Sequence, residues 1–365
     1  MQKKVIAAVI GGLLIAPAAF ADVTISGRLS TGFDMYKLGA GDAAAPAASY
    51  SAEQRISDQS SSLVFSGSED LGGGMSAWFR IDNRFSFPDA GFSASGNTMV
   101  GVKGGFGSIG VGRWDLHYNE LFRYDARTAG SLQSRLSGSA FSQVNGVAIA
   151  NNTRTPNLIK WDGHFGAVTA TIGYSTAGNT STATEGSGKG ATDGGKGDAV
   201  TAAIRYQGGP LSLGASLWSS KEEEAVAADL KQDSTRAWGG YQFGAFEVAL
   251  GYDQSEITSA GVKTKRTAFF VPVKFKTGSE TFYASFLSAD DLDIGGTTVS
   301  NSGATGYSVG WDHALSKATF VGVHYTQLDN DANVAYQLFA RGLSGTAAAA
   351  GESVNQIYLG IAHFY

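Results

Sequence analysis

Residues 75–85 read Met-Ser-Ala-Trp-Phe-Arg-Ile-Asp-Asn-Arg-Phe, and this stretch contains the pattern that decides the fold. Apolar side chains stand at nearly every odd-numbered position, whereas Arg80, Asp82 and Arg84 stand at even-numbered positions. Successive side chains of a β-strand point to opposite faces, so a period of two places one kind of side chain on each face. The stretch therefore predicts a strand with one apolar face and one charged face.

The same period of two recurs along the chain from residue 22 onward. Sixteen segments follow it: 22–36, 58–69, 75–87, 97–104, 107–114, 153–162, 165–176, 198–207, 210–220, 234–243, 245–255, 264–276, 280–289, 303–312, 318–328 and 353–365. Most contain about ten residues or more, which is the length with which a tilted strand crosses a bilayer. The prediction is an all-β chain of sixteen antiparallel strands, and an even number returns both ends to one side.

Two architectures use such strands: a soluble sheet that packs one face on a core, and a transmembrane β-barrel with a polar interior. The connections favour the barrel, because short and long ones alternate. Short connections are expected at 70–74, 105–106, 163–164, 208–209, 244, 277–279 and 313–317, and long ones include 37–57, 115–152, 177–197 and 329–352. A barrel that inserts from the periplasm keeps its short turns at one end and its long loops at the cell surface.

The positions of the charged residues also favour a barrel. The apolar faces of the clearest strands carry none, and an Arg or Lys that faces mid-bilayer lipid costs roughly 2–4 kcal/mol. The opposite faces carry Arg28, Asp34, Arg80, Asp82, Arg84, Lys160, Asp162, Arg205, Arg236, Glu247, Asp253, Arg266, Lys274 and Asp312. So many charges in a small packed core would have a large desolvation cost, so they predict a water-filled interior. Aromatic residues near the strand ends, such as Tyr174 and Phe246, are expected to form girdles at the lipid headgroups.

Residues 1–21 have the features of a secretory signal peptide. Lys3 and Lys4 form a positive start, residues 5–15 are apolar, and Ala19-Phe20-Ala21 is a small-x-small cleavage site. Cleavage there leaves residues 22–365 as the barrel domain. No later window has ~18 consecutive apolar residues, so no transmembrane helix is expected. The chain has no Cys and a net charge of −5, which exclude a disulfide framework and argue against a nucleic-acid partner.

Residues 61–74 read Ser-Ser-Leu-Val-Phe-Ser-Gly-Ser-Glu-Asp-Leu-Gly-Gly-Gly, which resembles the second strand and first turn of Gram-negative general porins. Further matches to that family follow in order: Asp22-Val23-Thr24 with Gly27-Arg28, residues 102–107 with Gly112-Arg113, Leu315-Ser316-Lys317, and residues 360–365. The resemblance implies a sixteen-stranded barrel, usually a homotrimer, whose third long loop folds into the pore. The chain ends on Tyr365 where the family usually has Phe, which bears on its recognition by the barrel-assembly machinery.

By position, residues 115–152 match the constriction loop that the resemblance implies. The acidic residues of this loop are Asp115, Glu120 and Asp125, and the basic residues of the early strands are Arg28, Arg80 and Arg84. We hypothesise that the two groups face each other across a narrow opening and that the field between them sorts solutes by charge. The alternative is that the arginines only neutralise the loop carboxylates and hold the loop in place.

Arg113 is expected to complete the constriction, although strict alternation from Ile109 and Val111 turns it toward lipid. A bulge near Gly110 or Gly112 would bring it inward. Basic residues outnumber acidic ones among the inward positions, which points to anion preference, whereas acidic loops argue the other way. The sequence leaves ion selectivity open.

The function that these expectations support is passive diffusion of small hydrophilic solutes and ions through a water-filled channel in the outer membrane. The alternative is a substrate-selective channel of the same fold, for sugars, phosphate or dicarboxylates, since Trp78, Trp218, Trp238 and Phe270 are expected to face inward. No motif indicates a catalytic site, and none of the five His residues has a metal-ligand spacing, so neither an enzyme nor a cofactor is expected. The expected partners are outer-membrane lipid and lipopolysaccharide.

Overall fold

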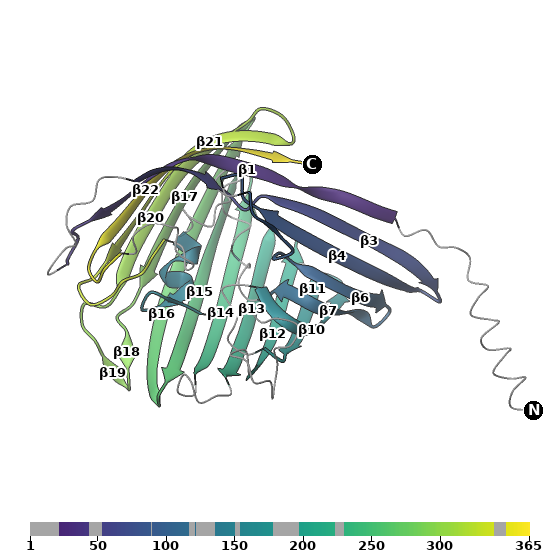
Figure 1. Ribbon diagram of the computed structural model, residues 1–365, viewed down its shortest axis with the longest axis horizontal. Helices are drawn as coiled ribbons and strands as arrows, with labels where there is room; N and C mark the ends of the chain where they lie inside the picture. Colours follow the sequence, from purple (N-terminus) through teal and green to yellow (C-terminus); the bar gives the residue numbers. More distant parts are fainter. Residues whose placement is uncertain are drawn as a thin grey trace, which may run out of the picture.

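The computed structural model describes residues 22–43, 53–88, 90–116, 121, 136–149, 154–177, 197–222, 230–338 and 348–365. Sixteen of the strands in these ranges form one antiparallel ring (Figure 1). The ring closes because β1 (Asp22–Gly39) pairs with β3 (Ser62–Gly72) on one side and with β22 (Ser353–Phe364) on the other. The expected sixteen-stranded barrel is confirmed, whereas the predicted signal peptide of residues 1–21 lies outside the described residues.

The remaining strands of the ring follow one another in chain order, each paired with the next. They are β4 (Met75–Phe85), β6 (Thr98–Gly104), β7 (Gly107–Asp115), β10 (Arg154–Phe165), β11 (Val168–Ser175), β12 (Gly197–Gly208), β13 (Leu211–Glu222), β14 (Lys231–Phe243), β15 (Phe246–Ser259), β16 (Val262–Thr277), β17 (Glu280–Ala289), β20 (Ala304–Ala314) and β21 (Thr319–Asn330). Among the described residues, no helix is long and apolar enough to cross a membrane.

The second strand of the ring is broken in the middle. β2 (Glu53–Asp58) pairs with residues 31–36 of β1, whereas β3 pairs with residues 22–28. Between β2 and β3, Ser60 adopts a φ of 69°, and the backbone N–H of Gln59 donates to the carbonyl oxygen of Ser30 at 2.8 Å. The break replaces the single segment 58–69 expected from the sequence. Because Ser60 lies between β2 and β3, its carbonyl oxygen is available to arginine side chains, which donate hydrogen bonds to it.

Two connections differ from the sequence prediction. The turn expected at residues 163–164 lies at 166–167, because β10 continues to Phe165. Gly163 is needed inside that strand, since a Cβ there would lie 2.4 Å from the Trp161 ring. Residues 256–263, expected as a loop, extend β15 and β16 to a tight turn at Ala260-Gly261. Their Thr, Glu and Lys side chains give no apolar alternation, so periodicity could not detect the extension.

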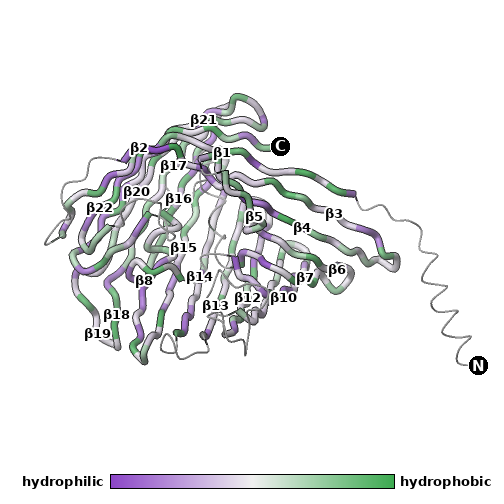
Figure 2. The backbone as a smooth tube through the Cα atoms, in the orientation of Figure 1, coloured by the Kyte–Doolittle hydropathy of each residue, from purple (hydrophilic) through white to green (hydrophobic). Residues whose placement is uncertain are grey.

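The two faces of each strand carry the expected kinds of side chain. Outward positions hold exposed apolar residues, such as Val23 on β1 and Leu250 on β15. Inward positions of the same strands hold Ser30, Asp34 and Asp253, all of which are buried. Hydrophilic and hydrophobic residues therefore alternate along the strands, as Figure 2 shows. An apolar outer surface of this kind matches the hydrocarbon of a membrane.

Aromatic side chains line the outside of β14 to β17 near the short turns. Ring centroids are 5.8 Å apart for Phe243 and Phe246, 4.6 Å for Phe246 and Phe275, and 6.3 Å for Phe275 and Phe282. A row of rings at the end of the apolar surface is the arrangement of an aromatic girdle at the headgroup level. This row marks the short-turn end as one membrane boundary.

A folded segment occupies part of the barrel interior. Residues 136–149 form η3 (Leu136–Gly138), η4 (Ala140–Ser142) and a hairpin of β8 (Gln143–Val144) with β9 (Val147–Ala148). Figure 1 places the helical turns inside the ring, against β15 and β16. Leu136 and Phe141 belong there to one buried apolar cluster with Leu287 of the wall. The described end of the expected constriction loop thus lies inside the barrel.

Candidate functional site

Arg28 and Arg84 converge on the break between β2 and β3. Arg28 Nε donates to the carbonyl oxygen of Ser60 at 3.2 Å, and Arg84 Nη1 donates to the same oxygen at 3.3 Å and to the Ser60 hydroxyl. The two arginines stand on either side of Ser62 in the register, so they occupy neighbouring strands at one level. The sequence predicted that these side chains share a face but gave no sign of the backbone oxygen that joins them.

Asp82 lies within this group and compensates part of its charge. Arg84 binds the Asp82 carboxylate with two parallel hydrogen bonds of 2.8 and 2.9 Å, and Arg80 Nη2 approaches it at 3.8 Å. Asp82 is almost fully buried, whereas the Arg80 side chain is 36% exposed. We call Arg28, Arg80 and Arg84 the arginine cluster. Asp58 also lies at this break, where its carboxylate accepts from the backbone N–H groups of Ser60 and Ser61 at 2.8 and 3.0 Å. Two carboxylates beside three guanidinium groups leave the site with net positive charge, and the Arg80 side chain is more exposed than that of Arg84, at 24%.

Of the acidic residues expected in the loop, only Asp115 lies in the part of the chain that the structure describes; Glu120 and Asp125 lie outside it. Asp115 ends β7 and is buried. Its carboxylate accepts a hydrogen bond from the Asn97 amide, and its backbone N–H donates to Asn97 Oδ1 at 3.0 Å. Asp115 therefore joins the end of β7 to the segment that precedes β6.

Arg113 stands opposite Thr98 in a register that runs without a shift along β6 and β7. The irregularity expected near Gly110 or Gly112 lies on the facing strand instead, where the pairing of β10 shifts between Thr155 and Leu158. Gly112 faces this shift with a φ of 149°, which favours glycine. The Arg113 side chain is partly buried at this edge of the site.

On the opposite wall, three buried charged residues hold the inserted segment, and we call them the loop anchor: Arg236, Asp253 and Arg266. Asp253 accepts from Arg236 Nε and from Arg266 Nη1, each at 2.8 Å. The guanidinium groups donate onward to the carbonyl oxygen of Phe141, from Arg236 at 3.0 Å and from Arg266 at 3.2 Å. Arg266 Nε also donates to the carbonyl oxygen of Gln143 at 2.9 Å.

The loop anchor corrects the sequence interpretation at these three positions. All three residues were expected to face water, yet their side chains are at most 2% exposed. Such burial is tolerated because the charges are paired and their remaining donors bind carbonyl oxygens. Arg236 also lies over the Phe141 ring, 4.3 Å from its centroid. Sequence periodicity predicted that these side chains point inward. It could not predict their hydrogen bonds to the inserted segment, which lies more than ninety residues earlier in the chain.

Two glycines of the wall make room for the inserted segment. A Cβ on Gly251 of β15 would lie 2.2 Å from Leu121 Cδ1 and 3.0 Å from Phe141 Cζ. A Cβ on Gly306 of β20 would lie 2.7 Å from a methyl carbon of Leu136. The missing side chains of these two glycines therefore leave space that apolar residues of the loop fill, and we call each such space a socket. Packing and hydrogen bonds together fix the segment against β14 to β20.

Residues 331–338, which follow β21, cover the inserted segment from the other side. Gln143 Nε2 donates to the carbonyl oxygen of Gln337 at 3.0 Å, and the Gln337 N–H donates to Gln143 Oε1 at 3.2 Å. Tyr336 beside it is fully buried in the same apolar cluster, and this burial raises the pKa of Tyr336 to about 12. The inserted segment is thus clamped between the wall and a second loop.

The large inward aromatic residues do not form a lining for solutes. Trp238 and Phe270 are buried in the cluster that holds the inserted segment, and Trp218 is buried with Met99 in a second cluster. Trp78 packs edge-on against Trp114 with ring centroids 6.3 Å apart. These residues face inward as predicted, but they pack against protein.

The arginine cluster and the loop anchor lie on opposite walls. β4 carries Arg80 and Arg84, and β15 carries Asp253, eight strands away in the ring of sixteen described strands. The anchor fixes the inserted segment to its own wall, and the arginine cluster faces the interior from the other wall. This geometry can narrow an aqueous path and expose it to a fixed positive charge.

Comparison with known proteins gives the family of the chain. The family model described as Gram-negative porin matches residues 5–333. Outer membrane porin protein 32 of Delftia acidovorans is 26% identical over 317 residues, which cover 84% of each chain. The major outer membrane protein P.IB of Neisseria meningitidis serogroup B is 36% identical over 115 residues. That match covers 31% of this chain and 34% of the length of the Neisseria protein.

Solved structures share the barrel. An anion-selective porin from Comamonas acidovorans superposes with a TM-score of 0.74 at 23% identity, covering 95% of this chain and 100% of that one. OmpT of Vibrio cholerae, in a trimer form, superposes with a TM-score of 0.69 at 13% identity, covering 94% and 99%. At these identities the structural similarity shows the fold alone. Membership of the family is shown by the match of the family model to residues 5–333 of the sequence. The chain belongs to the Gram-negative porin family.

Proposed function

We propose that this chain is a general diffusion porin of the outer membrane, with a constriction between the arginine cluster and the anchored loop and a preference for anions. The observation that carries the proposal is the placement of three arginines, only partly compensated by carboxylates, opposite a loop that the wall fixes by buried hydrogen bonds. Small hydrophilic solutes and ions pass by diffusion, without a binding step that requires a specific substrate. The family and the fold are those of channels and not of enzymes.

Anion preference follows from where the uncompensated charge lies. A positive group beside a narrow path lowers the energy of an anion in it and raises that of a cation. Two acidic residues of the described surface loops are engaged locally: Asp291 accepts from the Ser302 N–H at 2.7 Å and Asp293 from the Gly296 N–H at 2.9 Å. These carboxylates shape the rim, whereas the arginine cluster faces the interior. The solved porin with the highest TM-score reported above is described as anion-selective, which supports the same preference.

A substrate-selective channel is less well supported. Such a channel needs a continuous row of aromatic or polar side chains along which a solute can move. The aromatic residues that could have formed one, Trp238 and Phe270 among them, are buried under the inserted segment. Liposome-swelling rates for sugars of increasing size test this point. A general porin gives rates that fall smoothly with solute size, and a sugar that passes far faster than its size allows would favour the selective alternative.

The resemblance and the barrel also support a place in the outer membrane and three partners. Tyr365 joins the two ends of the ring, because its backbone N–H and carbonyl pair with Gly27 and its hydroxyl donates to the carbonyl oxygen of Ser62 at 3.1 Å. We propose that this aromatic terminus is read by the barrel-assembly machinery. A homotrimer and contact with outer-membrane lipid and lipopolysaccharide complete the proposal, and crosslinking followed by gel electrophoresis tests the trimer.

A further inference from the structure

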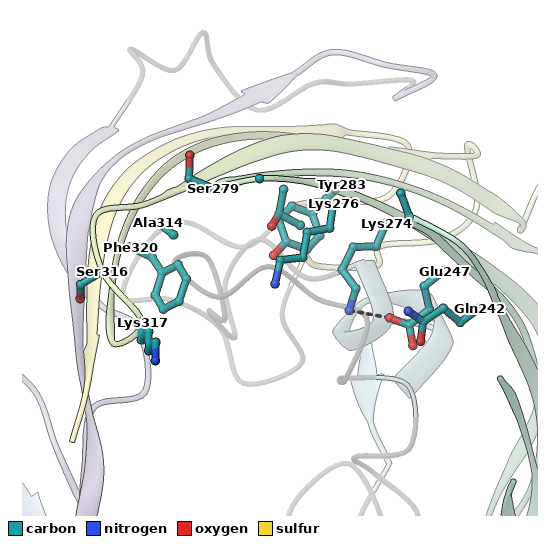
Figure 3. Close-up of a pocket in the computed structure, with 13 residues that line it drawn as sticks. Gln242, Glu247, Lys274, Lys276, Ser279, Tyr283, Ala314, Ser316, Lys317 and Phe320 are labelled. Atoms are coloured by element: carbon teal, nitrogen blue, oxygen red, sulfur yellow. Dashed lines mark ion pairs between the residues drawn. The ribbon is translucent and has the colours of Figure 1, made fainter. Parts of the chain in front are cut away.

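A second basic site lies inside the barrel at the end of the short turns, away from the arginine cluster. A cavity of about 610 Å³ opens there between three consecutive short turns, which join β14 to β15, β16 to β17, and β20 to β21. Lys274, Lys276 and Lys317 line it, with Glu247 as its one acidic residue (Figure 3). We call it the lysine vestibule. Arg266 and Lys276 lie ten residues apart on β16, roughly 30 Å along the strand, so the vestibule is a separate site.

The charge of the vestibule is only partly compensated. Glu247 pairs with Lys274 at 2.8 Å. Glu280 begins the neighbouring strand, but its carboxylate is turned to the outside, where it binds Trp311 Nε1 and His313 Nδ1, each at 2.7 Å. Within the part of the chain that the structure describes, no ion pair joins Lys276 or Lys317 to a carboxylate. Figure 3 shows the Lys276 ammonium group directed into the cavity and Lys317 at the opposite side of it.

Neutral hydrogen-bond donors complete the lining. Gln242, Thr281, Tyr283 and Ser316 also line the cavity and carry amide or hydroxyl groups. Ammonium and hydroxyl groups together are the donors that phosphate and carboxylate oxygens accept from. The volume exceeds that of a single small anion, since one water takes up about 30 Å³, so an anion would keep part of its hydration shell. Weak binding of this kind allows the anion to leave again, as conduction requires.

We propose that the lysine vestibule is a low-affinity binding site for small polyvalent oxyanions of the inorganic phosphate class, attracted by the charges of Lys276 and Lys317. The site rests on the proposed channel function, because its ligand reaches it through the pore. It concentrates such anions at the short-turn mouth of the barrel. Monovalent anions bind it less, because the attraction to the two ammonium groups grows with the charge of the anion.

The test uses the full barrel in planar bilayers at constant potassium chloride, with inorganic phosphate added in steps on both sides. Phosphate that occupies the vestibule reduces the chloride current, and the half-blocking concentration measures its binding. Lys276→Gln combined with Lys317→Gln is expected to raise that concentration roughly three- to tenfold. Lys276→Arg combined with Lys317→Arg is expected to restore it, because the charge is kept.

Lys103→Gln is the matched control. Lys103 lies near the short turn of β6, eight strands from β16 in the described ring, and does not line the cavity. The phosphate concentration that half-blocks the Lys103→Gln channel should equal that of the unmodified protein. An equal shift in Lys103→Gln and the double variant, or no shift in either, overturns the site. A protein that forms no conducting channels would instead reject the proposed function itself.

Discussion

Arg266 on β16 donates from Nε to the carbonyl oxygen of Gln143, 2.9 Å away and 123 residues earlier in the chain. This bond and its neighbours turn a long connection into a fixed part of the barrel wall. Each Arg of the anchor is held by Asp253, so the position of the inserted segment depends on a small set of buried charges. The position of this segment therefore determines the width of the lumen that remains open.

Arg266→Ala should release the inserted segment. Removing one member of a buried ionic network leaves Asp253 partly unpaired, which costs about 3–5 kcal/mol. We expect rapid current fluctuations in single-channel records and new protease cleavage between residues 136 and 149. Lys265→Ala is the control, because this neighbour lies on the outer face of the same strand. Equally steady currents in Arg266→Ala and the unmodified protein would contradict the anchoring role.

Gly251→Val should displace the same segment by sterics alone. A Cβ at this position meets Leu121 at 2.2 Å, so the loop must move or the wall must deform, at a cost of about 1–3 kcal/mol. Conductance in planar bilayers should change while the barrel still folds, as judged by heat-modifiable migration on gels. Gly239→Ala on the outer face of β14 meets only the tip of Leu213 and should behave like the unmodified barrel. A normal conductance in Gly251→Val would show that the socket does not position the loop.

The contact between the two loops should weaken in alkali. Burial raises the pKa of Tyr336 from its ordinary 10.0 to about 12, so the folded state favours the neutral phenol. The stabilisation is fully present below pH 10 and is lost as the pH rises from 10 to 12. Limited proteolysis of the loops over this range should show release of residues 331–338. The Tyr336→Phe variant has no group that ionises at this position, so its loops should stay resistant to proteolysis up to a higher pH. The same pH dependence of proteolysis in both proteins would exclude Tyr336 as the cause.

Asp82→Asn should strengthen anion preference. The carboxylate compensates part of the arginine cluster, and its removal adds one positive charge to the site. The permeability ratio of chloride to potassium should rise on the order of twofold. Asp162→Asn, which removes a lumenal carboxylate paired with Lys160 elsewhere on the wall, is the comparison and should have the smaller effect. A larger effect at Asp162 would place the selective step outside the arginine cluster.

The sequence was sufficient to predict the barrel and the faces of its strands, because lipid outside and water inside impose a period of two on every strand. It placed Arg28, Arg80 and Arg84 on one interior wall for the same reason. It could not predict that Arg236 and Arg266 are buried, since their partners lie in a loop without periodicity. The turn expected at Gly163 was wrong because this glycine serves side-chain packing between Trp161 and Phe165.

We propose that the arginine cluster selects ions at a constriction that the loop anchor holds in place. The most direct test is the reversal potential of Arg80→Ala combined with Arg84→Ala in a potassium chloride gradient. We expect a clear shift away from anion preference, with loop proteolysis unchanged because the anchor is intact. A reversal potential equal to that of the unmodified protein would contradict it and reduce the two arginines to a structural role.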